Sequence, residues 1–194
     1  MKKPIIALIL AAVLLFAASA GLEGVATANA EKAHLQLMQT ILPGATEFTA
    51  EPYAGEDANI RSVHKSDLGF VVETATYGYA GEITMLVGVN NSGKITGLVV
   101  REAHETFGLG ANALTDHEFL AQFLNSAGTF EVATSGADAF SGATAEAEVE
   151  GETVSVDAIT GATVTSKAVV RCINSAVAYV TGADAVTEAT SWGG

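Results

Sequence analysis

The hydrophobic positions begin with one long uncharged run near the N-terminus. No charged residue occurs from Pro4 to Leu22, and Lys2 and Lys3 precede this run. A run of about 20 residues can cross a bilayer as a helix, and the two lysines favour a cytoplasmic N-terminus. A cleaved signal peptide fits the same pattern, with small residues at 18–20 or 28–30 as the cleavage site. Both alternatives place the rest of the chain outside the cytoplasm.

From residue 31 the spacing of apolar residues becomes helical. Apolar residues recur every three or four positions over 31–42, at Leu35, Met38, Ile41 and Leu42, and Pro43-Gly44 ends the pattern. Residues 44–60 are polar, which predicts a loop.

From Ile60 the central part of the chain has a pattern typical of strands. Segments rich in β-branched and aromatic residues predict strands over 69–77, 83–89 and 94–101. Gly78–Gly81 predicts a turn, and Asn90–Gly93 is a hairpin signal. Together these segments predict an antiparallel sheet with one buried face.

The C-terminal half predicts two helices and a further strand. A short helix is expected over 116–124, a loop over 133–152, and a strand over 153–156. The last helix carries an apolar stripe and ends at Gly182. Its stripe consists of Val169, Val170, Ile173, Ala176, Val177 and Val180.

Charge and cysteine content exclude several classes of function. The chain has 22 acidic and 9 basic residues, a net charge of -13, which argues against nucleic acid or an anionic membrane surface as a partner. The single cysteine, Cys172, cannot form an intrachain disulfide and is expected to be buried. The four histidines lack metal-type spacing, so no metal site is expected. No residue in the sequence is identified as a general base or nucleophile, so no catalytic side chain is expected.

One stretch carries candidate chemistry, Asp157-Ala-Ile-Thr-Gly-Ala-Thr-Val-Thr-Ser166. Gly161 and Ala162 leave little bulk around Thr163, so its hydroxyl can be reached from solvent. Thr165 and Ser166 are good N-cap residues for the helix that follows. A helix N-terminus attracts anions such as phosphate. The stretch therefore predicts a surface turn that displays a threonine hydroxyl beside an anion site.

Residues 157–163 resemble the Asp-x-x-(Ser/Thr)-Gly-Ala-Thr attachment motif of covalently flavinylated FMN-binding domains. These domains occur in the G subunit of the Rnf electron-transport complex and the C subunit of the sodium-pumping NADH:quinone reductase. The resemblance implies that Thr163 carries FMN through a phosphoester, which a flavin transferase makes from FAD. It also implies that the transferase recognises Asp157. The resemblance further implies that Thr160, Gly161, Ala162 and Thr165 of this stretch take part in cofactor binding.

The motif occurs a second time, at Asp138–Thr144. An acidic run, 145–152, follows this copy, and its carboxylates would repel a phosphate. A capped helix follows Thr163 instead. This context favours Thr163 over Thr144 as the attachment residue.

A glycine-rich loop over 104–111 is similar to the Glu-Thr-Pro-Gly-Leu-Gly loop that lies against the flavin in the same family. Phe107 stands where the family usually has proline. The resemblance implies that five loop residues bind the cofactor: Glu105, Thr106, Gly108, Leu109 and Gly110. The Gly93–Gly97 return and the Leu-Pro-Gly at 42–44 are also similar to the family.

The sequence thus predicts an α+β protein, an N-terminal transmembrane helix followed by an antiparallel-sheet FMN-binding domain with flanking helices. The expected parts are an anchor over 1–30, a helix and linker over 31–60, the FMN domain over 61–182 and a tail over 183–194. The resemblance favours the anchor over a cleaved signal, and so a single-pass inner-membrane protein with its FMN domain outside the cytoplasm.

By resemblance, the expected function is an electron relay without catalysis of its own. Its complex would transfer electrons between ferredoxin and NAD, coupled to sodium or proton transport. The implied partners are the other membrane subunits and the flavin transferase. A stand-alone exported FMN-binding reductase or electron shuttle is the alternative, and a non-redox binding module, in which both Gly-Ala-Thr motifs are only turns, is a third.

Overall fold

The computed structural model describes residues 29–108, 110–133 and 153–182. The chain forms two compact units, residues 1–37 and 38–194. Of the first unit, the described residues 29–37 are helical, and helical geometry continues to residue 41, close to the predicted end. The expected membrane segment, Pro4–Leu22, lies outside the described residues. Within the described part, no helix is long and apolar enough to cross a bilayer.

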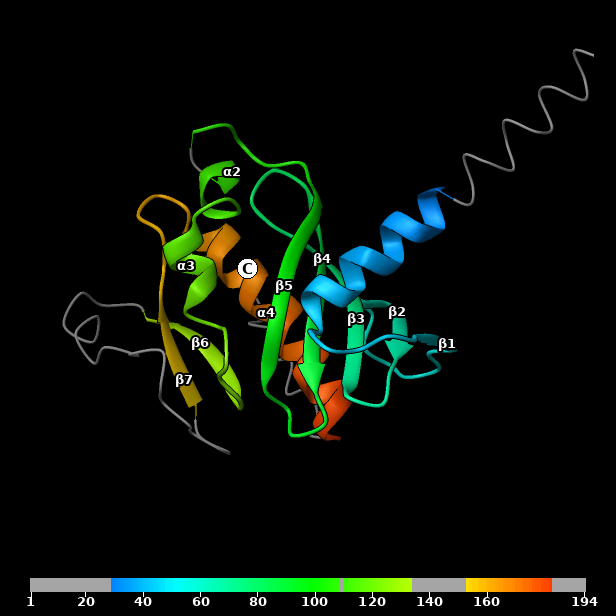
Figure 1. Ribbon diagram of the computed structural model, residues 1–194. Helices are drawn as coiled ribbons and strands as arrows, with labels where there is room; N and C mark the ends of the chain where they lie inside the picture. The colour runs from blue at the N-terminus through cyan, green and yellow to red at the C-terminus, as the bar shows by residue number, and fades with distance from the viewer. Residues whose placement is uncertain (1–28, 109, 134–152, 183–194) are drawn as a thin grey trace, which may run out of the picture. The chain divides into compact units, whose positions relative to one another are not determined.

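The second unit is built on a five-stranded antiparallel sheet with its strands in chain order (Figure 1). The three predicted strands are confirmed, with bounds shifted by at most two residues. The prediction of a loop over 44–60 was wrong in part, because Thr49–Glu51 form an edge strand, whereas the expected change to a strand pattern at Ile60 matches the start of the second strand. The strands are β1 (Thr49–Glu51), β2 (Ile60–Lys65), β3 (Gly69–Tyr77), β4 (Glu82–Asn90) and β5 (Ile95–Ala103).

Both predicted turns are present and join the central strands. Gly78 N donates to Gly81 O at 2.8 Å in the β3–β4 turn. In the β4–β5 hairpin, Asn90 N donates to Lys94 O at 2.9 Å, and Gly93 adopts φ +81°. A positive φ favours glycine, so the hairpin signal has a direct backbone cause.

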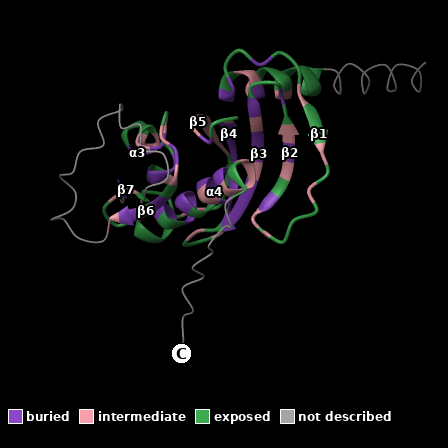
Figure 2. Ribbon diagram, turned by 90° about the horizontal axis from the view of Figure 1, so that it is seen from below, coloured by how far each residue is buried: buried purple, intermediate pink, exposed green. Residues whose placement is uncertain are grey.

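The long helix α4 (Thr163–Thr181) covers one face of the sheet and forms the main core. The predicted apolar stripe is buried from Val169 to Val177, and Val180 packs at its margin. Figure 2 shows buried residues, in purple, on α4, β3 and β4, and residues of these three elements form one hydrophobic cluster. Gly182 caps the helix in a left-handed conformation, as predicted.

The opposite face of the sheet receives the end of the first helix. Val87 and Val89 face α4, so Gly88 between them points to the other side, where it is paired with Gly97 of β5. A Cβ on either glycine would lie 2.6 Å from the backbone oxygen of Ile41. Thr96 Oγ1 donates to that same oxygen at 2.8 Å. The two glycines therefore allow the helix end to lie directly on the strands.

A second, smaller sheet was not predicted. It consists of β6 (Thr129–Ala133) and the expected strand β7 (Thr153–Asp157), which pair in parallel. The Asn174 side chain of α4 accepts from Phe130 N at 2.9 Å and donates to Phe130 O at 2.8 Å, which attaches β6 to the helix. The fold is α+β, with this parallel pair added to the antiparallel sheet.

Two short helices precede β6. These are α2 (Gly110–Ala113) and α3 (His117–Ala121). The predicted helix over 116–124 is thus shorter than expected, with Asp116 as its N-cap and turns over 122–125. Phe123 still packs edge-on between Phe119 and Phe130, with ring centroids 5.4 Å apart in each pair. These aromatic contacts attach the region to the core.

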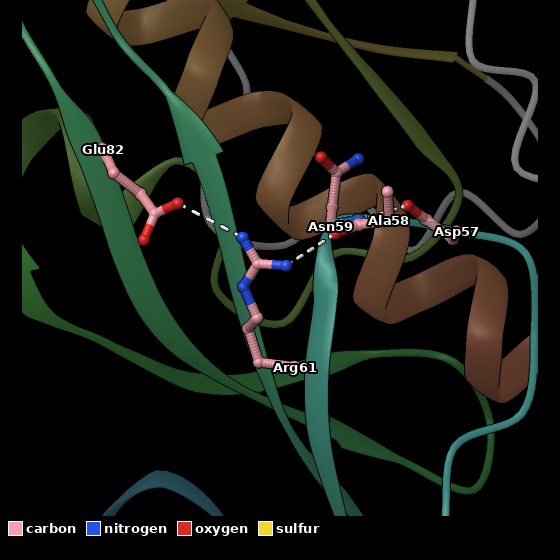
Figure 3. A network of polar contacts seen from close by, with 5 residues as sticks. All are labelled: Asp57, Ala58, Asn59, Arg61 and Glu82. Carbon is pink, nitrogen blue, oxygen red and sulfur yellow. Dashed lines mark hydrogen bonds and ion pairs between the residues drawn. The ribbon is translucent and has the colours of Figure 1, made fainter.

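A charged groove of about 330 Å³ crosses four strands of the sheet, β2 to β5. Arg61 donates to Ala58 O at 3.0 Å and pairs with Glu82 at 3.1 Å, as Figure 3 shows. Arg101 pairs with Glu73 at 2.8 Å. These pairs are partly exposed, and such pairs contribute about 0–1 kcal/mol each. The groove contains none of the predicted site residues.

Candidate functional site

The predicted attachment stretch forms the turn between β7 and the start of α4. Gly161 adopts φ +81°, and Ala162 N donates to Ile159 O at 2.9 Å. This turn makes Thr163 the first residue of α4 and leaves its side chain exposed. Ala162 occupies the N-cap position and provides no side-chain hydrogen bond. The backbone N–H groups in the first turn of this long helix can therefore donate hydrogen bonds to an anion.

The prediction that Thr165 and Ser166 cap this helix was wrong. Gly161 turns the chain into the helix earlier, so both residues lie inside the first turn, 1% and 0% exposed. Ser166 Oγ instead accepts from Ile159 N at 3.2 Å. That bond closes the turn against the helix and helps to fix the position of Thr163.

Gln122, a residue that no motif indicated, holds the start of the turn at Asp157. Gln122 follows α3, and its side-chain oxygen accepts from Asp157 N at 2.7 Å. Its amide nitrogen donates to Asp157 O at 3.3 Å. Both bonds use backbone atoms of Asp157, so its exposed carboxylate faces solvent. Thr160 is exposed as well.

The predicted glycine loop connects β5 to α2. Gly108 adopts φ +83°, a conformation that favours glycine. Ala111 N donates to Thr106 O at 3.2 Å, which closes the loop onto α2. Phe107 is 94% exposed. Leu109 lies outside the described residues.

Glu105 joins this loop to the β3–β4 turn. Its Oε1 accepts from Tyr79 N at 2.8 Å and from Ala80 N at 3.4 Å. A Cβ on Gly78 would collide with Oε1, so this turn needs a glycine to approach the carboxylate. Arg171 of α4 donates to Tyr77 O at 2.8 Å and ties the same turn to the helix.

The two predicted site segments meet at Gly110. A Cβ on Gly110 would lie 2.5 Å from Glu105 Oε2 and 2.7 Å from Thr165 Oγ1. Both oxygens are buried, and neither has a hydrogen-bond partner among the described residues. Buried polar atoms are usually paired, because an unpaired one loses its bonds to water without replacement. This end of the domain thus has two acceptor oxygens to offer a ligand.

Figure 1 shows the β3–β4 turn, the start of α2 and the β7–α4 turn at the same end of the sheet. The structure therefore brings Glu105, Gly110 and Thr165 together, and Thr165 lies in the same first turn of α4 as Thr163. The second motif, Asp138–Thr144, lies outside the described residues. Sequence reasoning missed Gln122 and Tyr79, which carry no motif, and it expected the Arg171 side chain to be solvated or to reach a phosphate, whereas that side chain binds the backbone oxygen of Tyr77.

Metal and thiol chemistry find no support in the described part of the chain. It holds no group of three or more His, Cys, Asp or Glu residues suited to a metal ion. Cys172 is fully buried, as predicted, and burial raises the pKa of its thiol to about 11.

Cys172 is therefore expected to resist alkylation in the folded protein. With a pKa of about 11, only about one thiol in a thousand is ionised at pH 8, and the thiolate is the reactive form. Iodoacetamide should label Cys172 in denaturant and leave it unmodified without denaturant, as intact-mass measurement can show. Rapid labelling of the folded protein would contradict the buried position.

Comparison with known proteins gives consistent matches. The FMN-binding domain family matches residues 78–178, a span that contains both Glu105 and Thr163. The G subunit of the sodium-translocating ferredoxin:NAD⁺ oxidoreductase complex of Acetobacterium woodii is 33% identical over 157 residues, 72% of this chain and 70% of that protein. The G subunit of the ion-translocating oxidoreductase complex of Methanosarcina acetivorans is 36% identical over 157 residues, 75% of this chain and 73% of the relative. Among solved structures, NqrC of Shewanella oneidensis matches with a TM-score of 0.43 and 25% identity, over 70% of this chain and 64% of that one.

Proposed function

Because this chain belongs to the FMN-binding domain family, we propose that it is a flavoprotein electron carrier of an ion-translocating oxidoreductase complex. Its relatives in Acetobacterium and Methanosarcina are G subunits of such complexes. The observation that carries the proposal is the meeting of two unpaired buried oxygens, on Glu105 and Thr165, beside Gly110 and close to the start of α4, where Thr163 lies. These residues fit a cofactor that has a phosphate at one end and hydrogen-bond donors at the other.

FMN is held, in this proposal, by a phosphoester to the exposed hydroxyl of Thr163. The Thr163 oxygen forms the bond to phosphorus and loses its proton, the pyrophosphate bond of FAD breaks, and AMP leaves. The exposed Asp157 and Thr160 are available to the flavin transferase that performs this step. The resulting phosphodiester lies at the N-terminus of α4, where the helix dipole stabilises negative charge.

The noncovalent contacts come from both segments. Gly161 and Ala162 give access to Thr163, and Thr165 supplies a hydroxyl from the first turn of α4. From the glycine loop, Glu105 supplies a carboxylate oxygen, and Gly110 leaves the space between these two oxygens. Thr106, Gly108 and Leu109 complete the proposed binding loop. FMN supplies the redox chemistry and exchanges electrons singly or in pairs, while the protein fixes its position.

The proposed setting is a membrane complex. The uncharged run Pro4–Leu22 is proposed as a single-pass anchor, with the N-terminus in the cytoplasm and the FMN domain outside it. Other subunits of the complex deliver and remove electrons, between ferredoxin and NAD, with sodium or proton transport. A covalent bond keeps the cofactor on an exported domain, where free FMN would be diluted.

Reduction of the bound flavin separates an electron relay from an independent reductase. In membranes that contain the whole complex, NADH or reduced ferredoxin should bleach the visible absorption of the flavin on this protein. The purified, flavin-loaded protein should not be reduced by NADH on the same timescale, because the relay depends on its partners. Equally fast reduction of the isolated protein would favour a stand-alone reductase.

A further inference from the structure

The Glu105 carboxylate is asymmetrically bonded. Oε1 accepts two backbone N–H groups, from Tyr79 at 2.8 Å and Ala80 at 3.4 Å. Oε2 is buried and has no donor among the described residues. The two N–H groups fix the carboxylate in place, so its second oxygen points to one defined spot beside Gly110.

Thr165 does not satisfy this second oxygen. Its hydroxyl also lies beside Gly110, yet the two oxygens form no hydrogen bond and both remain unpaired. An ionised Glu105 carboxylate accepts hydrogen bonds and donates none, whereas the threonine hydroxyl can donate or accept. The arrangement therefore suits a group that brings an N–H or O–H donor for the carboxylate and a further polar atom for the hydroxyl.

Exposed aromatic and apolar side chains occur in the segments that meet at Gly110. Tyr79, whose N–H binds Glu105, is 73% exposed, and Phe107, two residues after Glu105, is 94% exposed. On the other side, Val164 precedes Thr165 and is 48% exposed. Six large hydrophobic side chains are exposed in the described part of the chain, and these three belong to segments that contact Glu105 or Thr165 or contain one of them. A flat, largely apolar ring with an N–H edge fits such surroundings better than a polyol chain does.

We propose that Glu105 Oε2 accepts a hydrogen bond from an N–H of the FMN ring and that its negative charge makes the flavin harder to reduce. This inference rests on the proposed function, and it assigns Glu105 the role of setting the reduction potential. Reduction adds electron density to the ring, and a fixed carboxylate next to the ring opposes that change in charge. The Thr165 hydroxyl, which also lies beside Gly110, provides a second polar contact to the ring from α4.

The test compares the midpoint potential of flavin-loaded wild type with that of Glu105→Gln. Glutamine keeps the shape of the side chain and removes its charge. The variant is expected to be at least ten times easier to reduce at equilibrium, a rise of about 30 mV for a two-electron couple. Glu102→Gln is the matched control, because it removes the same charge three residues away, from a side chain that is 70% exposed. It should leave the potential nearly unchanged.

Three results would overturn the inference. The potential of Glu105→Gln could equal that of wild type, or Glu102→Gln could shift it equally, which would reveal only a long-range field. Alternatively, Glu105→Gln could alter only the melting temperature of the flavin-free protein, as expected if Oε2 binds a buried water. If wild type itself carries no FMN, the proposed function fails as well, so the two failures are distinguishable.

Discussion

Thr163→Ala protein, made together with the flavin transferase, is expected to carry no covalent FMN. The phosphoester needs a hydroxyl oxygen that the transferase can reach, and alanine removes it. The neighbouring hydroxyls of Thr165 and Ser166 are buried inside the first turn and cannot replace it. Flavin fluorescence of the protein band on a denaturing gel gives a direct readout. Electron transfer through the assembled complex should be lost with the band.

Two further variants make this result specific. Thr163→Ser restores a hydroxyl and should restore at least part of the fluorescence. Thr144→Ala changes the second motif and should leave the fluorescence at the wild-type level. If Thr144→Ala lost the flavin and Thr163→Ala kept it, the attachment site would be Thr144, and the argument from the acidic run after it would be wrong.

Gly97→Ala is expected to destabilise the domain strongly. Its new Cβ would lie 2.6 Å from the backbone oxygen and 2.9 Å from the Cα of Ile41. Backbone cannot rotate away as a flexible side chain does, so the end of the first helix must move off the sheet. Overpacking of this kind costs about 1–3 kcal/mol. For a domain of this size, each kcal/mol lowers the melting temperature by roughly 2–4 °C.

Gly182→Ala provides the control for this variant. Nothing lies within 4 Å of a Cβ at Gly182, but its φ is +66°, so alanine meets only backbone strain. That strain costs about 1–2 kcal/mol. A melting temperature for Gly97→Ala equal to wild type would show that Ile41 does not lie against this strand pair.

Local sequence signals predicted the central strands and the long helix. Asn90–Gly93 and Gly78–Gly81 encode turns, and the segments beside them are rich in β-branched and aromatic residues, which favour strands. By contrast, β1 and β6 could not be predicted, because their pairing depends on distant residues. β1 is three residues long and is defined by its partners in β2, and β6 pairs in parallel with a strand much later in the chain.

The motifs of the candidate site could be predicted from the sequence, whereas the residues that hold the attachment turn in place could not. Asp157–Thr163 and the glycine loop are recognisable from side chains, and the structure brings the two segments together at Gly110. The side chains of Gln122 and Ser166 hold the attachment turn by accepting hydrogen bonds from the backbone N–H groups of Asp157 and Ile159. Such bonds cannot be recognised from a sequence motif. The error in the helix cap has the same origin, because the left-handed φ of Gly161 decides where α4 begins.

Peptide mass spectrometry of the protein purified from native membranes tests the central claim most directly. We predict one peptide with the added mass of FMN, and fragments that place the modification on Thr163. Unmodified peptides covering both Thr163 and Thr144 would contradict the covalent attachment and remove the main support for an electron-carrying function.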